Sequence, residues 1–270
     1  MTTIEYSNEL PARLLACDHA LLESREERGV QSDENQSALV FWESTTPFVV
    51  VGYTEHVARE VNLKECARLQ IPVLRRISGG GTVVQGAGCL NYSLVLPIDE
   101  HTLNLQQTNN YVMQRQRDAL QTLISQTMVP QTLLSSTSST RSTSDARVAI
   151  RGTTDLALVD SESEKKFSGN AQRRKKNWLL FHGTILLDFD RSLIAQLLHF
   201  PSRQPDYRAD RNHLDFVCNF PASRELVKNA LRGAWNAHRV LDVASEYIPH
   251  SRIEELARDV YAQRSWNLRW

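Results

Sequence analysis

The chain has 270 residues, with 31 basic and 31 acidic side chains, so its formal net charge at neutral pH is zero. This length favours one large domain or two small ones, with enough chain to bury a sizeable core. The balanced charge argues against a protein built mainly to bind nucleic acid or acidic membranes, because such proteins carry a clustered basic excess. The longest apolar runs, such as residues 48–51, are too short to cross a bilayer.

The N-terminal half predicts two long helices and several short strands. A helix is expected from Asn8, as its cap, to about Glu23, followed by a polar loop over residues 25–37. Two β-rich runs, residues 38–43 and 48–51, are separated by Ser-Thr-Thr-Pro and predict a hairpin. The sequence then predicts a short helix over residues 61–69, an extended stretch over 72–76, a strand over 92–96 and a long amphipathic helix over 103–128.

The C-terminal half begins with a low-complexity stretch, SSTSSTRSTS at residues 135–144, within which we expect a mobile surface loop near 135–145. Strands are predicted over residues 155–159 and 178–187, and helices over 190–199 and 224–235. A last helix is expected to begin at a capping box formed by Ser251 and Glu254. Strands and helices mix without a regular βαβ alternation, so we expect an α+β fold with a mixed β-sheet flanked by helices, as one domain over residues 1–270.

The four cysteines lie far apart, with no Cys-x-x-Cys pair and no Cys/His spacing typical of a metal site: Cys17, Cys66, Cys89 and Cys218. Free thiols in a reducing compartment are therefore expected. The N-terminal residues show neither a secretory signal nor a basic amphipathic presequence. These features together predict a cytoplasmic location.

Glycines cluster in one segment, with five of the chain's 11 glycines at Gly79, Gly80, Gly81, Gly86 and Gly88. Such density indicates a backbone that turns tightly or approaches a ligand closely, and successive N–H groups in such a turn can bind an anion. The two preceding arginines, at 75 and 76, offer the planar fork that suits a phosphate or carboxylate. The alternative is a glycine-rich hairpin with two solvated arginines. The segment is neither a Walker A loop nor a G-x-G-x-x-G motif.

The most basic stretch contains Lys165, Lys166 and the run Arg173-Arg174-Lys175-Lys176. A solvated, charged hairpin is one interpretation, and a nucleic-acid patch is disfavoured because no aromatic residues are interleaved for stacking. Lys166 is followed closely by Ser168-Gly169, for which we expect a turn. A turn there would hold the Lys166 cation over an anionic site.

These two segments resemble motifs of the lipoate–protein ligase A family. RRISGGGTVVQGAGCLNYS resembles that family's RRxSGGGxV signature, and KFSGNAQ with the later His-Gly-Thr resembles its K-x-S-G-x-A…H-G-T segment. VFWESTTPFVVVGY and RGTTDLAL agree as well, so the resemblance extends from about Asp18 to beyond Leu187. Four motifs in this order are typical of the biotin/lipoate ligase superfamily. The lysine segment favours the lipoate branch, because the KWPND-like segment of biotin ligases is missing.

The resemblance implies a catalytic domain like those of class II tRNA synthetases and biotin–protein ligases. It implies a reaction in which lipoate and ATP, with Mg²⁺, form lipoyl-AMP and pyrophosphate, and the acyl group then passes to a lysine of a lipoyl domain. The implied partners are such acceptor proteins, namely the E2 subunits of 2-oxoacid dehydrogenases and the H protein of glycine cleavage. Nucleic acids and membranes are not expected as partners.

The resemblance also assigns site residues. Lys166 is the implied catalytic residue, since a carboxylate that attacks an α-phosphate brings two anions together and needs a neutralising cation. Asp155 is the implied Mg²⁺ ligand. The implied contacts with the acyl chain or the adenylate are Trp42, Arg76, Ser78, Gly79, Gly80, Gly81, Val83, Gly169, Ala171, His182, Gly183 and Thr184. Trp42 and His182 fit an ordinary structural role equally well.

The chain departs from the family at three places. Gln85-Gly86 stands where the family commonly has His-Asp, and Thr154 stands where an Asn often precedes the metal-binding Asp. The chain ends at Trp270, where many members continue into a C-terminal accessory domain, so we expect that domain to be absent. A separate partner subunit or a preformed acyl donor would then be needed if the catalytic domain activated lipoate poorly alone.

Two other functions remain as alternatives. The first is an octanoyl or lipoyl transferase, which takes the acyl group from a carrier-protein thioester, commonly through a cysteine nucleophile. Residues 148–160, where the family's nucleophile would lie, contain no cysteine. A transferase that uses Lys166 as a general base escapes this objection. The second alternative is a non-catalytic lipoate-binding subunit.

Overall fold

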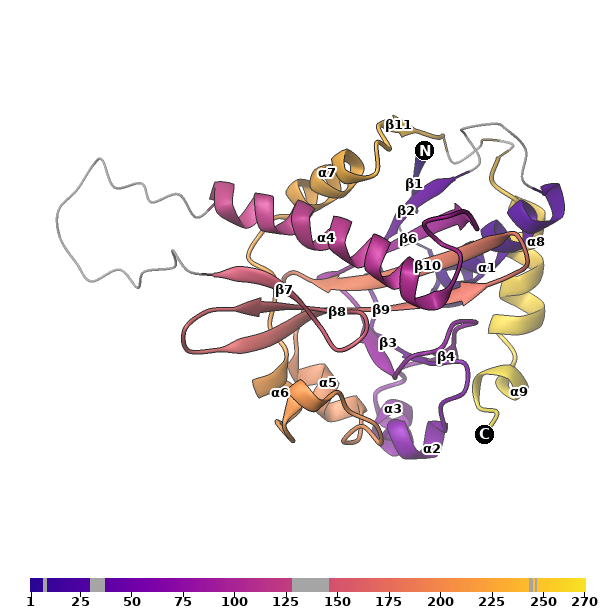
Figure 1. Ribbon diagram of the computed structural model, residues 1–270. Coiled ribbons are helices and arrows are strands. Elements are labelled where there is room, and N and C mark those ends of the chain that lie inside the picture. The colour runs from indigo at the N-terminus through magenta and orange to yellow at the C-terminus, as the bar shows by residue number, and fades with distance from the viewer. Residues whose placement is uncertain (7–8, 30–36, 128–145, 243–244, 246) are drawn as a thin grey trace.

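The computed structural model describes residues 1–6, 9–29, 37–127, 146–242, 245 and 247–270. Its largest element is an eight-stranded sheet that runs through the centre of the molecule (Figure 1). The strand order is β11 (Arg239–Val240), β1 (Thr2–Tyr6), β2 (Ala38–Trp42), β6 (Cys89–Pro97), β10 (Trp178–Leu186), β9 (Glu164–Arg174), β8 (Asp155–Val159) and β7 (Arg147–Arg151). Strand β1 is parallel to both of its neighbours and the remaining pairs are antiparallel. The predicted mixed sheet is thus confirmed.

A second, three-stranded sheet has the order β4 (Val73–Arg75), β3 (Phe48–Val51) and β5 (Val83–Gln85). Side chains of β3 alternate between two clusters of buried residues, because successive residues of a strand point to opposite faces. Phe48 and Val50 join the cluster around the first helix, whereas Val49 and Val51 join a separate cluster with residues of the short helices that follow. Those short helices are α2 (Val57–Glu60), α3 (Leu63–Arg68), α5 (Ser192–Leu197), the 3₁₀ turn η1 (Asp206–Arg208) and α6 (His213–Phe216).

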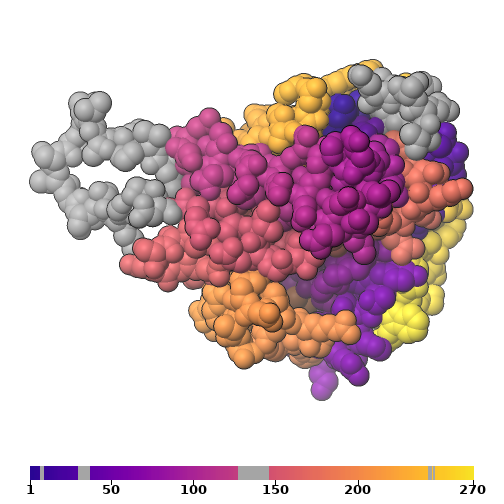
Figure 2. Space-filling model, in the orientation of Figure 1, coloured from indigo at the N-terminus to yellow at the C-terminus, as the bar shows by residue number. Residues whose placement is uncertain are grey.

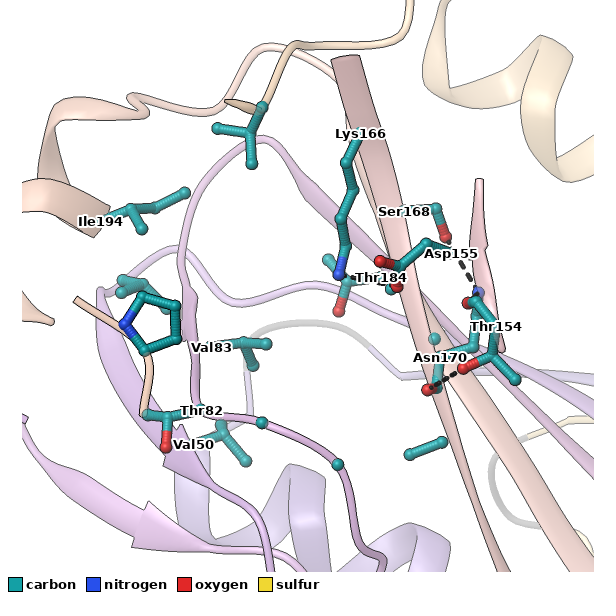
Figure 3. A pocket seen from close by; sticks show the side chains of 18 of the residues that line it. Val50, Thr82, Val83, Thr154, Asp155, Lys166, Ser168, Asn170, Thr184 and Ile194 are labelled. Atoms are coloured by element: carbon teal, nitrogen blue, oxygen red, sulfur yellow. Dashed lines mark hydrogen bonds and ion pairs between the residues drawn. The ribbon is translucent and has the colours of Figure 1, made fainter. Parts of the chain in front are cut away.

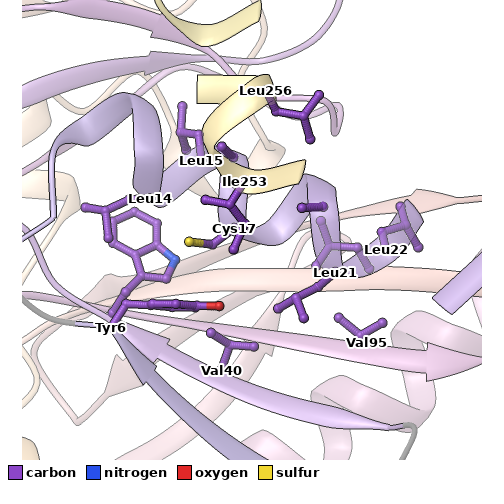
Figure 4. Close-up of a cluster of buried hydrophobic side chains, with 14 of the residues drawn as sticks. Tyr6, Leu14, Leu15, Cys17, Leu21, Leu22, Val40, Val95, Ile253 and Leu256 are labelled. Carbon is purple, nitrogen blue, oxygen red and sulfur yellow. The ribbon is translucent and has the colours of Figure 1, made fainter. Parts of the chain in front are cut away.

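Helices cover both faces of the large sheet. Helix α1 (Pro11–Arg28) packs on one face and is contacted by α8 (His250–Leu256) and the π-helical turn η2 (Ala257–Tyr261), and α9 (Arg264–Asn267) then contacts η2 and β4. Figure 4 shows the α1 side chains Leu14, Leu21 and Leu22 between the sheet and α8. Helices α4 (Leu105–Thr127) and α7 (Arg224–Ala234) pack on the opposite face. In the space-filling view, α4 lies across the upper part of the molecule, and the α5–α6 segment, which packs with the small sheet, lies at the bottom (Figure 2).

The predicted hairpin of residues 38–43 and 48–51 is wrong. Strand β2 pairs with β1 and β6 in the large sheet, whereas β3 pairs with β4 and β5 in the small one. Both strands are buried along their whole length, which is typical of strands covered on both faces. Apolar runs of this kind do not reveal their partners, and the Pro47 segment carries the chain from one sheet to the other.

Helix boundaries differ from the predictions in a few places. The first helix begins at Pro11 and ends at Arg28, so the predicted loop is wrong over residues 25–28; Asn8 lies outside the described residues. Arg25 is buried there and donates to the carbonyl of Tyr247, a residue far away in the sequence. Local sequence does not reveal this contact, which involves the last turns of the helix. The predicted capping box is also wrong, because Ser251 lies inside α8 and the cap position is Pro249.

The predicted helix over residues 61–69 is confirmed as α3, which is capped by the Asn62 side chain, and the sequence did not predict α2, which precedes it. The predicted long helix is α4, which ends at Thr127. The expected loop at 135–145 lies outside the described residues. In the described ranges, no helix is both long enough and apolar enough to span a membrane.

Candidate active site

A cavity of about 570 Å³ lies between the large sheet and the small one. Its walls come from strands β2, β5, β6, β9 and β10, the glycine-rich loop, the turn before β8 and the segment from α5 to α6. All predicted site residues except Ser78 and Gly79 line this cavity, and Ser78 is buried and hydrogen-bonded to the lining residues Arg76 and His182. The sequence motifs, which are spread over more than a hundred residues of the chain, therefore meet in one place.

Lys166 forms an ion pair with Asp155 inside the cavity, with 2.7 Å between Nζ and Oδ1 (Figure 3). The predicted Ser168-Gly169 turn is wrong, because both residues lie within the long strand β9. The Lys166 side chain instead lies along its own strand over Gly169, because a Cβ atom on Gly169 would lie 2.8 Å from Nζ. Gly169 therefore leaves space for the Lys166 side chain. This space explains why position 169 is a glycine without the ligand contact that the resemblance assigned to Gly169.

Asp155 has a partner on each oxygen. Its Oδ1 pairs with Lys166, and its Oδ2 accepts a hydrogen bond of 2.8 Å from the phenol of Tyr207. Burial, together with the neighbouring Asp155 carboxylate, raises the pKa of Tyr207 well above its ordinary value, so the phenol stays a donor. No group of three or more His, Cys, Asp or Glu residues that could hold a metal occurs in the described part of the chain. A single carboxylate fits Mg²⁺, which takes most of its other oxygen ligands from phosphates and water.

Both arginines of the glycine-rich segment are buried, so the solvated hairpin is wrong. Arg76 Nε donates to Ser78 Oγ, and its Nη2 donates to the carbonyls of Gly79 and Gly81 at 2.6 and 2.8 Å. Burial lowers the pKa of Arg76 to about 10, which still leaves it protonated at neutral pH. The guanidinium fork, which the sequence suggested for a ligand, is thus occupied in holding the glycine loop closed.

The glycine loop itself passes close to the small sheet. Gly80 has a φ of +83°, and a Cβ atom on Gly52 would lie 1.9 Å from the Gly80 carbonyl oxygen. No main-chain carbonyl among the described residues accepts from the N–H groups of Gly79, Gly80 or Gly81. Gly80 and Gly81 line the cavity, and two consecutive donors there form the kind of concave site that binds a phosphate or carboxylate oxygen.

A chain of hydrogen bonds runs behind the loop to helix α1. Ser78 Oγ lies 2.5 Å from His182 Nε2, and His182 Nδ1 lies 3.2 Å from Oδ2 of the buried Asp18. Asp18 Oδ2 also accepts a hydrogen bond of 2.8 Å from Ser93. With a neutral imidazole, the consistent directions are Arg76 to Ser78, Ser78 to His182 and His182 to Asp18. The sequence analysis missed Asp18, although an acidic residue among the buried leucines of α1 is a signal of such a contact.

A group of three polar side chains also lines the cavity. Gln85, Thr184 and Asn91 form a closed ring, in which Gln85 donates to Thr184 at 2.7 Å, Asn91 to Gln85 at 2.8 Å and Thr184 to Asn91 at 2.5 Å. Gln85, which stands where the family commonly has His, is thus hydrogen-bonded through both its amide nitrogen and its amide oxygen. The sequence analysis did not assign Asn170, which stands at a variable position of the K-x-S-G-x-A motif, and it did not assign Tyr207 to the site.

The part of the cavity next to α1 and the small sheet is apolar. Leu15, Trp42, Val50 and Val83 line it, and the Trp42 ring stacks on Phe48 with 6.4 Å between ring centroids. A site with an apolar channel at one end and the Lys166 cation with free N–H donors at the other suits an amphiphilic acid.

None of the four cysteines, all of which lie in the described residues, lines the cavity. Burial raises the pKa of each thiol, to about 11 for Cys218 and well above the ordinary value for Cys17 and Cys89. Cys66 has a raised pKa for the same reason. Because the thiolate is the nucleophilic form, none of these side chains is placed or ionised for attack on an acyl group.

Comparisons with known proteins agree with this geometry. The family model described as the lipoyl protein ligase A/B catalytic domain matches residues 11–222. The octanoyltransferase LipM of Brevibacillus brevis is 27% identical, and the match covers 96% of this chain and 95% of that protein. Lipoate–protein ligase 1 of Staphylococcus aureus is 24% identical over 82% of this chain and 61% of that protein.

Among solved structures, that of a bi-partite lipoate protein ligase and its E2 lipoyl domain from Thermoplasma acidophilum matches with a TM-score of 0.73. The identity is 20%, and the match covers 99% of this chain and 95% of that one. This likeness shows a shared fold. Since ligases and a transferase both occur among the similar proteins, the acyl donor has to be argued from the site.

Proposed function

The chain belongs to the family of the lipoyl protein ligase A/B catalytic domain, and we propose that it is an ATP-dependent lipoate–protein ligase. The observation that carries this proposal is that the described residues lining the cavity include no cysteine, but do include the Lys166 cation and the N–H donors of Gly80 and Gly81. A site of this kind is suited to bringing two anions together, and it offers no thiol for an acyl-enzyme thioester.

In the first step, a lipoate carboxylate oxygen attacks the α-phosphorus of ATP, and the bond from that phosphorus to the bridging oxygen breaks to release pyrophosphate. The apolar channel around Trp42 holds the acyl chain, and Lys166 leaves Asp155 to bridge the carboxylate and the α-phosphate. The N–H groups of Gly79, Gly80 and Gly81 bind oxygens of the adenylate. In the second step, the amine of an acceptor lysine attacks the acyl carbon, loses a proton and displaces AMP.

Asp155 is proposed as the protein ligand of Mg²⁺, an ion that neutralises phosphate charge when it is bound. The carboxylate becomes available to the ion once Lys166 moves to the substrates. His182, held by Asp18, keeps the Ser78 hydroxyl beside the loop that receives the adenylate. Thr184 and Ala171 complete the wall near the reacting atoms.

We propose lipoyl-domain proteins as the acceptors, including E2 subunits and the H protein, with the reaction in the cytoplasm. The chain is proposed to be a single catalytic domain that works with a separate accessory subunit. The fold likeness to a ligase that is described as bi-partite supports the second part of this proposal.

The second candidate is an acyltransferase that takes octanoate from a carrier-protein thioester, as the name of the LipM relative states for that protein. Here Lys166 would act as a general base in a direct transfer. The similarity over nearly the whole of both chains favours this candidate, and the lining without a cysteine weighs against its usual covalent route.

Lipoate-dependent exchange of labelled pyrophosphate into ATP tests the proposal without an acceptor. The reaction is run with and without a separate accessory subunit, and for a ligase exchange appears only when lipoate and Mg²⁺ are both present. A chain that shows no exchange, yet transfers octanoate from carrier protein without ATP, would belong to the transferases.

A further inference from the structure

The turn of residues 152–154 carries Asp155 into the cavity, and one side chain holds it in place. Asn170 of β9 donates through Nδ2 to the Thr154 carbonyl at 2.7 Å, and Thr154 Oγ1 donates to the Asn170 carbonyl at 2.8 Å. Figure 3 shows Thr154 and Asn170 facing each other beside the Lys166–Asp155 pair. Two reciprocal bonds thus fix the residue that directly precedes Asp155.

The same Asn170 side chain is anchored from the other side. Its Oδ1 accepts a hydrogen bond of 2.5 Å from the Tyr92 phenol on β6. Tyr92 is buried, and burial raises the pKa of its phenol well above the ordinary value, so it remains a donor. With the amide nitrogen and oxygen both engaged, the orientation of the Asn170 side chain is determined.

Gly183 makes this anchor possible. Tyr92, Gly183 and Asn170 lie in one row across β6, β10 and β9, so the Asn170 side chain must cross the middle strand to reach Tyr92. A Cβ atom on Gly183 would lie 1.6 Å from Asn170 Oδ1 and 2.6 Å from its Cγ. Gly183 does not have a positive φ, so its backbone conformation does not require glycine. Glycine is required because the Asn170 side chain occupies the space that a Cβ atom would fill.

We propose that Asn170 is the positioning residue for the Asp155 turn, and that Gly183 is a glycine in order to admit the Asn170 side chain. This gives the H-G-T glycine a role through the protein's own side chain, in place of the ligand contact assigned from the sequence. Asn170 acts on the reaction only through Asp155, so its expected effect on activity rests on the proposed function. Its expected effect on the order of the 152–155 turn is independent of the proposed function.

The first test follows amide hydrogen exchange of the 152–155 turn in the protein without substrates. Asn170→Ala removes the anchor and Gly183→Ala displaces it, so both should speed exchange of this turn by about tenfold, the effect of losing roughly one net hydrogen bond. The control is Gly233→Ala on α7, where a Cβ atom would meet nothing within 4 Å. It should leave exchange of the turn unchanged. Unchanged exchange in Asn170→Ala would overturn the proposal, whether or not the chain is a ligase.

The second test is a double-mutant cycle on lipoate-dependent pyrophosphate exchange. Each single variant should lower kcat/KM for Mg-ATP by about 10- to 100-fold and change KM for lipoate little, because the acyl channel is not touched. The variant with both substitutions should be no worse than Asn170→Ala alone, since both changes break one contact. Losses that multiply would mean that Gly183 has a separate role and would overturn the coupling. If the wild-type chain shows no pyrophosphate exchange either alone or with a separate accessory subunit, the proposed function fails while the hydrogen-exchange result still stands.

Discussion

Lys166 and Asp155 form a partly exposed ion pair, with 27% and 15% of their side-chain surfaces accessible. Pairs this exposed contribute little to the free energy of unfolding, because water competes for both charges. The geometry around the pair, however, is specific: Gly169 leaves room for the lysine, and Tyr207 fixes the second oxygen of the carboxylate. The arrangement stabilises the position of a cation more than it stabilises the fold.

Lys166→Ala should therefore lower the rate of acyl activation by about 100- to 1000-fold, as expected when one donor to a developing charge is lost. Its melting temperature should change little. The matched control is Lys165→Ala, because Lys165 is adjacent in the sequence and does not line the cavity. Acceptor modification that survives Lys166→Ala at the wild-type rate would remove Lys166 from the catalytic role.

Helix α1 contributes a buried carboxylate to a face that otherwise packs apolar side chains. Asp18 meets His182 of β10 and Ser93 of β6, two strands that pair directly through these residues. A carboxylate accepts from both neighbours at once, and through His182 it fixes the hydrogen bond to Ser78 beside the glycine loop. The packing of α1 on the sheet is thus linked to the orientation of a loop that lines the cavity.

Asp18→Asn preserves the volume of the side chain and tests this link. An amide that turns its N–H toward His182 Nδ1 reverses the imidazole tautomer, so that Nε2 donates to Ser78 and the chain of donors is broken. The variant should keep its near-ultraviolet circular dichroism and lose about tenfold in kcat/KM for lipoate, the effect of roughly one net hydrogen bond. Wild-type kinetics in Asp18→Asn would show that the Asp18 contact is structural only.

Across the whole molecule, the sequence predicted what local pattern encodes. The long helix α4, the strands β8 and β10 and the mixed sheet follow from periodicity, and the motifs that meet at the cavity follow from resemblance. The sequence did not predict which strands pair, because β2 and β3 are both buried apolar runs and nothing in either run indicates that they belong to separate sheets. Asp18 and Asn170 were missed for a related reason, because their partners lie far away in the chain and only the fold brings them together.

The fold also explains why two chemistries occur among proteins similar to this one. An apolar channel that ends at a lysine can present an acyl group to an acceptor whether the donor is an adenylate or a thioester. The described residues that line the cavity of this chain include no cysteine that could carry the acyl group as a thioester. The central claim is therefore a claim about the acyl donor.

The most direct test is the intact mass of a lipoyl-domain acceptor after incubation with this protein. One reaction contains lipoate and Mg-ATP, and the other contains octanoyl-carrier protein without ATP; both are run with and without a separate accessory subunit. The account predicts the mass gain of one lipoyl group in the ATP reaction and no gain in the carrier reaction. A gain only in the carrier reaction would contradict it and identify the protein as a transferase.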